Sequence, residues 1–441
     1  MTVGQIVGKT LTRFSPGSLL ELLALLFPIL LMTLSVNLVG FIERVFISRY
    51  SLQALEASLS VTYIIRIFQI SMVSIAGMAQ VYVGLYQGAQ EYLKIGKCVW
   101  QMIWFSIFSM GCTLPLSMLA AQLFIQGTDI ETLGYPYFIL LTSINFLFPL
   151  NTALTCFFLG RGKTRFILVI TILSVTLNLI LDRILILGVP NFIPVLGLTG
   201  GAFSALISQS LASVILFTIF LRRENREKFG SSDFTFQPSL FWTYVKPGVL
   251  RAIGRIALLV IWTFTAHIMT NRGGDYLLVL SIGGTLCLFF SFLGDGICQA
   301  LVTIFSNLLG AEKNYYLQKA LKTALIFLVF IETLLAVPLL LLPEYVLSLL
   351  LGGGTDEIPK KLLQTTLMWV WVQTVSYMLS SIFLSLLLVR KDTFFLLVLG
   401  CCSWILLFLP TYLTINIYEA SPDKFWLLNA LGAFLLVGIY I

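Results

Sequence analysis

The sequence predicts an all-α polytopic membrane protein with about twelve transmembrane helices. Of the 441 residues, 58% are hydrophobic and only 11% are charged, whereas charged residues make up about a quarter of a soluble domain. Apolar runs of roughly 20 residues, the length needed to cross a bilayer, recur along the whole chain. The first run begins near Ser18 and is long enough to span, so we expect no cleavable signal peptide.

The apolar runs give the expected helices in order. Several are longer than a bilayer requires, which indicates tilt or extension beyond the membrane. They lie near residues 18–46, 54–86, 98–125, 134–159, 166–189, 197–221, 245–270, 277–309, 319–343, 362–389, 394–418 and 424–441.

Basic residues alternate between the loops in a way that predicts the orientation. One side carries Lys94, Arg161, Arg222 and Lys313 with most of the other lysines and arginines. Because basic loops stay in the cytoplasm, we expect both termini to be cytoplasmic. The net charge of +7 then reflects these loops and not a nucleic-acid partner.

The chain also divides near its midpoint. The longest polar stretch, "RRENREKFGSSDFTFQPSLFW" (222–242), predicts a cytoplasmic linker at 222–244 between an N-terminal lobe, 1–221, and a C-terminal lobe, 245–441. "LGRGKTRF" (159–166) and "LVRKDTFF" (388–395) follow corresponding helices, and Pro28 is matched by Pro247. A repeat of six plus six helices predicts a substrate path between the halves.

Enzyme motifs are missing from the sequence. There is no G-x-x-x-x-G-K-[ST] phosphate-binding loop, no H-E-x-x-H, and His267 is the single histidine. The 7 cysteines lack metal-ligand spacing and are expected to be packing residues. We therefore expect no enzyme activity and no cofactor, and the organisation favours a secondary transporter.

Four stretches carry a resemblance to a known family. They are "FPILLMTLSVNLVGFIERVFISRYSLQALEASLSV", "FFLGRGKTRFILVITILSVTLNLILDRILILG", "GLTGGAFSALISQ" and "DGICQALVTIFSNLLGA". In order, spacing and chain length the sequence resembles the multidrug and toxic compound extrusion (MATE) transporters of the multidrug/oligosaccharidyl-lipid/polysaccharide flippase superfamily over nearly its full length.

The resemblance implies a fold and an activity. The expected fold is two six-helix bundles related by a pseudo-two-fold axis, V-shaped around a central cleft. The expected activity is alternating-access antiport, in which drugs or metabolites leave in exchange for protons or sodium ions. We also expect a monomer in a bacterial inner membrane, surrounded by lipid and with no nucleic-acid partner.

The resemblance also implies an ion site in the N-terminal lobe. Prokaryotic members often carry a proline followed by an acidic residue in helix 1, here Pro28 and Glu43, where glutamate replaces the usual aspartate. They carry an Asn-x-x-x-Asp pair in helix 5, here Asn178 and Asp182. In helix 6 the usual threonine position is similar to Ala205, with hydroxyls at Ser204 and Ser208 nearby. The glutamate expected in helix 7 is replaced by Arg255, so the second-half cation site is absent or rebuilt.

Helical geometry supports the pairing of Asn178 with Asp182. They are four residues apart and share a face, whereas Arg183 is rotated by about 100°. Glu43, Asn178, Asp182 and Ser204 could carry a proton, since burial favours a neutral carboxyl group, or Glu43, Asn178 and Asp182 could bind Na+ through oxygen atoms. A structural salt bridge from Asp182 or Glu43 to Arg44 or Arg183 is the third alternative.

Other residues within the spans have two interpretations each. Pro28 is either a hinge that responds to charge on Glu43 or Asp182, or a fixed kink. Arg255 either pairs with Asp295 and locks the second half, or lines a cationic cleft with Arg66 that favours anionic or zwitterionic substrates.

Two other functions remain open. A lipid-linked sugar flippase of the same superfamily would use buried arginines to bind a pyrophosphate headgroup, but twelve helices and the helix 5 match count against it. A membrane scaffold or receptor without transport is disfavoured by carboxylates at membrane depth.

Overall fold

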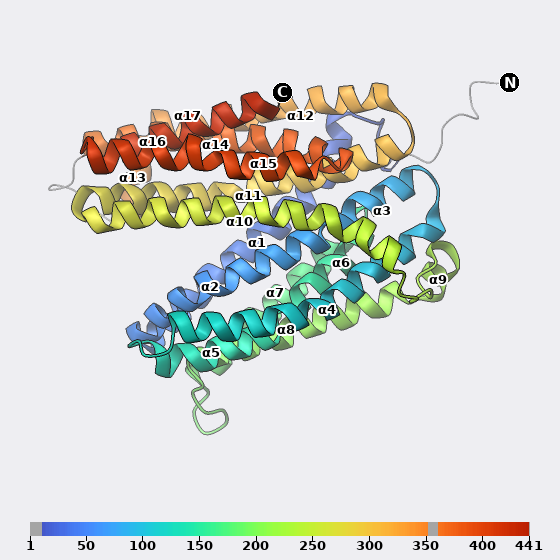
Figure 1. Ribbon diagram of the computed structural model, residues 1–441, viewed down its shortest axis with the longest axis horizontal. Helices are drawn as coiled ribbons and strands as arrows, with labels where there is room; N and C mark the ends of the chain where they lie inside the picture. The colour runs from blue at the N-terminus through green and yellow to red at the C-terminus, as the bar shows by residue number, and fades with distance from the viewer. Residues whose placement is uncertain (1–10, 352–359, 441) are drawn as a thin grey trace. The chain divides into compact units, whose positions relative to one another are not determined.

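The computed structural model of the chain describes residues 11–351 and 360–440, so residues 1–10, 352–359 and 441 of the predicted lobes lie outside the described part. Eleven helices of this part are long and apolar enough to cross a membrane. The described residues are helical with no strand beyond one isolated bridge, Val189 to Ile193. The predicted all-α polytopic fold is thus confirmed (Figure 1).

The described part of the first half contains ten helices. All but the short, mostly charged helix at residues 223–229 are predominantly apolar, as expected for helices whose outer surface meets lipid. They are α1 (Leu19–Tyr50), α2 (Leu52–Ala76), α3 (Met78–Gly88), α4 (Tyr92–Phe124), α5 (Glu131–Ser143), α6 (Leu147–Leu159), α7 (Thr164–Leu187), α8 (Leu198–Phe220), α9 (Arg223–Phe229) and α10 (Pro238–Arg272).

The second half is interrupted more often. Pro338 and Pro410 lie at or next to π-helical segments, because proline cannot donate a backbone hydrogen bond and the helix adjusts locally. The elements are α11 (Gly274–Gly310), α12 (Asn314–Ala336), η2 (Val337–Leu341), α13 (Pro343–Leu351), α14 (Lys360–Arg390), α15 (Thr393–Ser403), η3 (Trp404–Phe408), α16 (Leu409–Tyr412), η4 (Leu413–Ile417) and α17 (Lys424–Tyr440).

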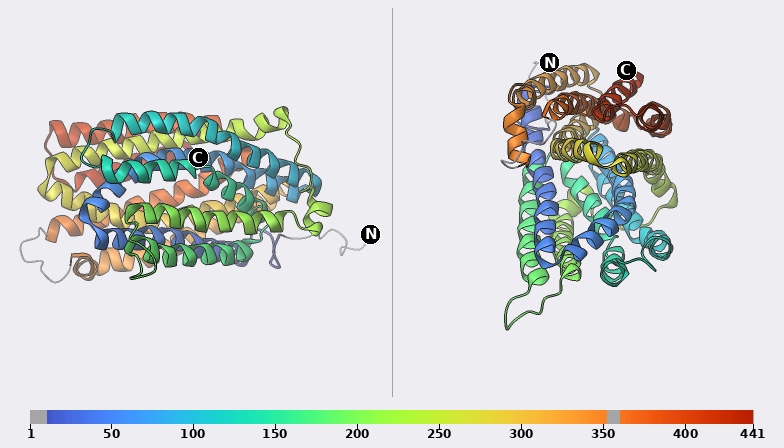
Figure 2. Two further views of the ribbon diagram at one scale, coloured as in Figure 1. Left: turned by 90° about the horizontal axis from the view of Figure 1, so that it is seen from below. Right: turned by 90° about the vertical axis from the view of Figure 1, so that its left-hand side faces the viewer.

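The elements gather into two compact units. The N-terminal unit is Phe27–Ala252 with Ser306–Lys313, and the C-terminal unit takes the described residues before Phe27, Ile253–Phe305 and those from Asn314 onward. In the first, α7 and α8 pack along each other, and in the second α14 and α17 do so (Figures 1 and 2). The boundary along α1 falls between Leu26 and Phe27, beside Pro28.

Each unit has its own apolar core. In the N-terminal unit, Val61, Phe138 and Ile186 belong to a cluster of buried side chains from α1, α2, α4, α5, α7 and α8. In the C-terminal unit, Leu367 and Trp426 belong to the corresponding cluster. Burial of side chains against neighbouring helices fixes which face of each helix points inward.

The expected helix boundaries need three corrections. Helix 2 is divided at Gly77 into α2 and α3, and helix 4 is divided between Ser143 and Leu147 into α5 and α6. Helix 7 begins at Pro238 and not near 245, because proline is well accommodated in a first helical turn. The last helix, α17, has 17 residues and is shorter than the eleven spans.

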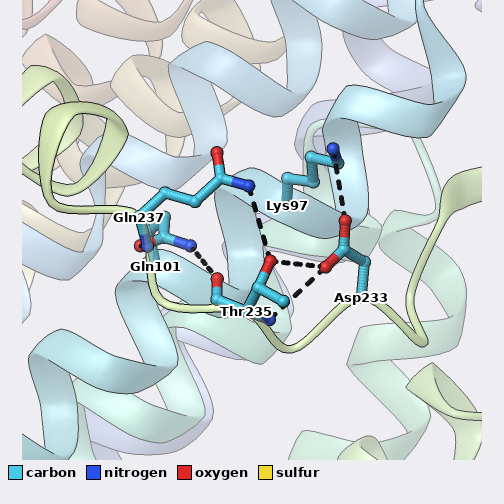
Figure 3. A network of polar contacts seen from close by, with 5 residues as sticks. All are labelled: Lys97, Gln101, Asp233, Thr235 and Gln237. Carbon is cyan, nitrogen blue, oxygen red and sulfur yellow. Dashed lines mark hydrogen bonds and ion pairs between the residues drawn. The ribbon is translucent and has the colours of Figure 1, made fainter.

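The polar stretch before α10 is fixed along α4 (Figure 3). Gln101 is buried, and its Nε2 atom donates to the Thr235 carbonyl at 2.8 Å. Its Oε1 atom accepts from the backbone N–H of Gln237 at 3.1 Å. Lys97 pairs with Asp233 at 3.2 Å. The indole of Trp100 donates to the Ser231 carbonyl at 2.8 Å. The predicted linker is therefore an ordered part of the N-terminal unit.

Charged side chains also stabilise this polar stretch. The hydrogen bond from the Thr235 hydroxyl lowers the pKa of the Asp233 carboxyl, and Lys97 acts in the same direction. A carboxyl group whose pKa is lower in the folded than in the unfolded chain stabilises the fold at pH values above its unfolded-state pKa. This contribution is lost as the pH falls through the lower, folded-state pKa. Arg161 packs its guanidinium 3.7 Å from the centre of the Phe229 ring. Burial lowers the pKa of Arg161 to about 10, so it stays cationic at neutral pH.

We expect Gln101→Leu to lower the free energy of unfolding by about 1–3 kcal/mol, because it leaves the Thr235 carbonyl and the Gln237 amide without their buried partner. Chemical unfolding of the purified protein in detergent measures this change. Lys97→Met is the control, since it removes a partly exposed ion pair worth about 0–1 kcal/mol. Equal effects of the two substitutions would contradict the role assigned to Gln101.

Candidate functional site

The site begins with the close packing of α7 against α8. A Cβ atom on Gly200 would lie 2.6 Å from the Leu185 carbonyl oxygen, so only glycine allows the two backbones to approach this far. The approach buries Asp182 completely, at 0% exposure, while Arg183 remains exposed. The predicted separation of these two neighbouring charges is therefore present in the structure.

Ser204 of α8 joins the two polar residues of α7. Its hydroxyl accepts a hydrogen bond from the Asn178 side-chain nitrogen at 3.2 Å. Its proton can be donated either to Asp182 Oδ1 or to the Gly201 carbonyl, which is 2.8 Å away. Among the described residues Asp182 Oδ2 has no hydrogen-bond partner. A buried carboxylate oxygen without a partner is costly, so this atom is available to a proton or a cation.

Glu43 of α1 reaches the same place. A Cβ atom on Gly201 would lie 3.0 Å from Glu43 Oε1, so the carboxylate rests directly against this glycine. Glu43 is close enough to Asp182 for their charges to interact. The structure thus brings together the four N-terminal residues that the sequence suggested, Glu43, Asn178, Asp182 and Ser204.

The salt-bridge alternative does not appear in the structure. Within residues 11–351 and 360–440, no basic nitrogen of Arg44 or Arg183 lies within 4.0 Å of the Glu43 or Asp182 carboxylate. Arg44 influences Glu43 electrostatically without contacting it as an ion pair. In the described part of the chain the two carboxylates therefore interact with each other without a basic group in ion-pair contact.

Tyr137 of α5 is a neighbour that sequence reasoning missed. Its side chain is 4% exposed, bonds to Thr62, and is near enough to Glu43 and Asp182 to interact with their charges. Nothing in the sequence distinguishes it from the other 15 tyrosines, because its neighbours Glu43, Thr62 and Asp182 come from three other helices.

The oxygen atoms of this site suit two kinds of ion. Carboxylate, hydroxyl and backbone carbonyl oxygens are ligands of hard cations, and a buried carboxyl group can instead hold a proton. Among the described residues no cluster of three or more His, Cys, Asp or Glu side chains forms a transition-metal site. The donor set at Glu43, Asn178, Asp182 and Ser204 therefore fits a monovalent cation or a proton.

The remaining predicted residues lie apart from this cluster. Pro28 is buried within α1, which continues through it to Tyr50. Arg66 of α2 is exposed and close enough to Arg44 for the two charges to repel. Arg66 and Arg255 belong to different compact units, and the cleft predicted to be lined by both stays a prediction.

The predicted pairing of Arg255 with Asp295 does not form. No ion pair within 4.0 Å joins them in the described part of the chain. Asp295 Oδ1 instead accepts a hydrogen bond from the Tyr377 hydroxyl at 3.0 Å, and Arg255 is exposed on α10. The hydrogen-bond partner of Asp295 is thus a neutral hydroxyl from α14 and not the Arg255 guanidinium.

Ser204→Ala tests the geometry of the cluster. We expect it to lower the free energy of unfolding by about 1–3 kcal/mol, because Asp182 and Asn178 both lose their buried partner. Ser208→Ala is the matched control on the same helix, since the Ser208 hydroxyl donates to Ala205 of its own helix. Thermal unfolding in detergent compares the two, and a larger loss in Ser208→Ala would contradict this arrangement.

Known proteins resemble this chain in sequence and in fold. The probable multidrug resistance protein NorM of Thermotoga maritima is 24% identical over 209 residues, which cover 46% of this chain and 45% of that protein. The alignment thus spans less than half of the curated relative.

Solved structures match nearly the whole fold. A MOP superfamily transporter from Pyrococcus furiosus, for which a reversed polarity of the binding pocket suggests a different function, superposes with a TM-score of 0.82 at 14% identity. The match covers 97% of this chain and 94% of that one. The eukaryotic MATE transporter AtDTX14 gives a TM-score of 0.78 at 16% identity, covering 95% and 94% of the two chains.

A family model completes the comparison. The MatE model matches residues 28–184 and 237–413, which include Pro28, Glu43, Asn178 and Asp182. It leaves out residues 185–236, and with them the whole of α8 and its Ser204, and it matches both halves of the chain separately. The chain therefore belongs to the MatE family of membrane transporters.

Proposed function

We propose that this transporter exports small organic compounds in exchange for protons or sodium ions that bind at Glu43, Asn178, Asp182 and Ser204. The observation that carries the proposal is Asp182: it is completely buried, and one of its oxygens has no partner among the described residues. A group of this kind at membrane depth is expensive unless it binds an ion during function.

Charge repulsion between Glu43 and Asp182 supplies the coupling. When both carboxyl groups are ionised, they repel each other across a site with no basic residue in ion-pair contact. One bound cation, either H+ or Na+, removes that repulsion and favours the packed arrangement of α1 against α8. Release of the cation restores the repulsion and disfavours that packed arrangement. The site therefore binds the ion with different affinities in two conformations, as coupling requires.

The two candidate ions make different demands on the site. A proton needs one carboxyl oxygen, and Asp182 Oδ2 is available for it. A sodium ion needs several oxygens at once, which Glu43, Asp182, the Ser204 hydroxyl and the Asn178 amide oxygen would supply. Pro28 is proposed as the hinge through which α1 responds, with both termini in the cytoplasm and the monomer in a bacterial inner membrane.

A second candidate function is the export of anionic metabolites. Arg44 and Arg66 are exposed, lie close enough to repel each other, and form no ion pair within the described ranges. Two exposed arginines outside ion pairs would favour an anionic or zwitterionic substrate. This candidate uses the same ion site and differs in the charge of the exported compound.

We expect Asp182→Asn to abolish gradient-driven export, because asparagine neither binds a proton at neutral pH nor carries a charge for sodium. The measurement is efflux of ethidium from liposomes under an imposed proton gradient or, separately, an imposed sodium gradient. Glu43→Gln should reduce the flux at least about ten-fold, the consequence of losing roughly 1.4 kcal/mol of ion coupling. The gradient that drives wild-type efflux identifies the ion.

Arg183→Gln is the matched control, since this arginine follows Asp182 directly but is exposed. It should transport like the wild type. Gradient-driven flux that persists in Asp182→Asn would refute the ion-coupling proposal. Loss of anion export in Arg66→Gln, with ethidium export retained, would favour the second candidate function.

A further inference from the structure

The connection between α7 and α8 is an ordered hairpin. It comprises residues 188–197, and we call it the α7–α8 hairpin. Val189 and Ile193 exchange two backbone hydrogen bonds of 3.0 Å. The hairpin projects across the direction of the helices and away from the other helices of the N-terminal unit (Figures 1 and 2). It is thus a protruding element with a defined backbone.

The hairpin exposes apolar side chains and carries no charge. Phe192 is 87% exposed and Val195 is 55% exposed. The sequence contains no Asp, Glu, Lys or Arg between Arg183 and Arg222. The loop at residues 125–130, between α4 and α5, is different, because it contains the exposed Asp129. An exposed apolar surface of this kind marks contact with a partner or a membrane.

The backbone of the hairpin is suited to an apolar environment. Lipid cannot form hydrogen bonds with N–H groups, so these groups must be satisfied within the protein. Pro190 and Pro194 have no N–H group. The N–H groups of five other residues of the hairpin donate to backbone carbonyls, namely those of Val189, Phe192, Ile193, Leu196 and Gly197. Most of the hairpin backbone therefore does not depend on water for its donors.

The length of α7 places the hairpin near a bilayer surface. The helix has 24 residues, and this length corresponds to about 36 Å, compared with about 30 Å for the hydrocarbon core. Lys163 and Arg165 are exposed at its other end. Next to the hairpin, Ile180 of α7 and Phe203 of α8 are exposed and apolar. A hairpin that runs sideways from this level follows the bilayer interface.

We propose that the α7–α8 hairpin inserts Phe192 into the interface of the phospholipid bilayer and anchors the adjoining ends of α7 and α8 there. Apolar side chains of interfacial segments reach about 5–10 Å into the boundary between headgroups and acyl chains. Lipid is the occupant because the apolar surface of the hairpin is continuous with the exposed apolar surface of α7 and α8. In the predicted orientation this is the outer leaflet.

The anchor is firmly joined to the N-terminal unit. The N–H groups of Leu196 and Gly197 donate to the carbonyls of Leu185 and Ile186 in the last turn of α7, at 3.0 and 3.2 Å. A Cβ atom on Gly197 would lie 2.5 Å from the Tyr50 ring, so the base of the hairpin also contacts the end of α1. The depth of the hairpin in the bilayer therefore sets the depth of three helix ends.

The test is the depth of a nitroxide on Val195→Cys, in the full chain with its 7 native cysteines replaced by alanine, in phosphatidylcholine vesicles. Electron paramagnetic resonance compares collisions with oxygen, which concentrates in lipid, and with a neutral nickel chelate, which stays in water. We expect oxygen collisions to dominate. Adding Phe192→Asp should shift the label towards water, because a carboxylate is costly in lipid.

The neighbouring loop supplies matched controls. Gln126→Asp adds the same charge to an exposed position of residues 125–130 and should leave the depth of the label unchanged. A nitroxide on Asp129→Cys provides the reference for a label in water.

Three results would overturn the proposal. Nickel collisions as frequent as those at Asp129→Cys would place the hairpin in water. Poor access of both reagents would indicate a protein contact, such as a second copy of the chain, in place of lipid. An unchanged depth after Phe192→Asp would remove the role of Phe192.

A second measurement uses the chain with its native cysteines, in case the cysteine-free chain does not fold. Phe192→Asp should lower the midpoint of thermal unfolding in phosphatidylcholine nanodiscs, because the exposed side chain loses its lipid contact. Gln126→Asp should leave the midpoint unchanged. Equal midpoints for the wild type and Phe192→Asp would refute the anchor. No measurement needs an ion gradient, so the inference is independent of the proposed export function.

Discussion

The close approach of α7 to α8 is the contact on which the ion site depends. Gly200 lets the Leu185 backbone come near, and the same approach places Ser204 against Asp182. One residue further, Gly201 leaves room for the Glu43 carboxylate from α1. In a bilayer, helices gain little from burying apolar surface against each other, so such small-residue packing has a large share in positioning them. Three helices thus contribute to a single polar cluster because two successive residues of α8 have no side chain.

The sequence predicted correctly the features that depend on the geometry of a single helix. Helical spacing put Asn178 and Asp182 on one face and separated Arg183 from them, and hydropathy located the membrane helices. It did not predict the neighbours of side chains that depend on contacts between helices. In the described part of the chain the Arg255–Asp295 pair does not form, and Asp295 is hydrogen-bonded to Tyr377 of α14 instead. Tyr137 was missed because its polar neighbours come from other helices. Nothing in a single sequence encodes those neighbours directly.

Both compact units contain the same local chemistry in different helices. Asp182 has one oxygen bonded to Ser204, and Glu332 has one oxygen bonded to Thr374, while the other oxygen of each lacks a partner in the described structure. In the N-terminal unit the arrangement adjoins a second carboxylate, Glu43. In the C-terminal unit it adjoins a cavity of about 360 Å³ that is lined by aromatic side chains such as Trp262 and Trp426. The same pair of carboxylate and hydroxyl thus lies beside a second carboxylate in one unit and beside a mostly apolar cavity in the other.

The segment between α9 and α10 has a mechanical consequence. Its hydrogen bonds to Trp100, Gln101 and Trp104 of α4 are made mainly by its own backbone carbonyls. Asp233 also pairs with Lys97, and the rings of Phe234 and Phe236 pack against Trp100 and Trp104, so backbone and side chains together fix the path of the segment. Because the first residues of α10 follow at once, a displacement of α4 would be transmitted to that end of α10 without slack. The segment thus connects α4 rigidly to the start of α10 and is not a flexible linker.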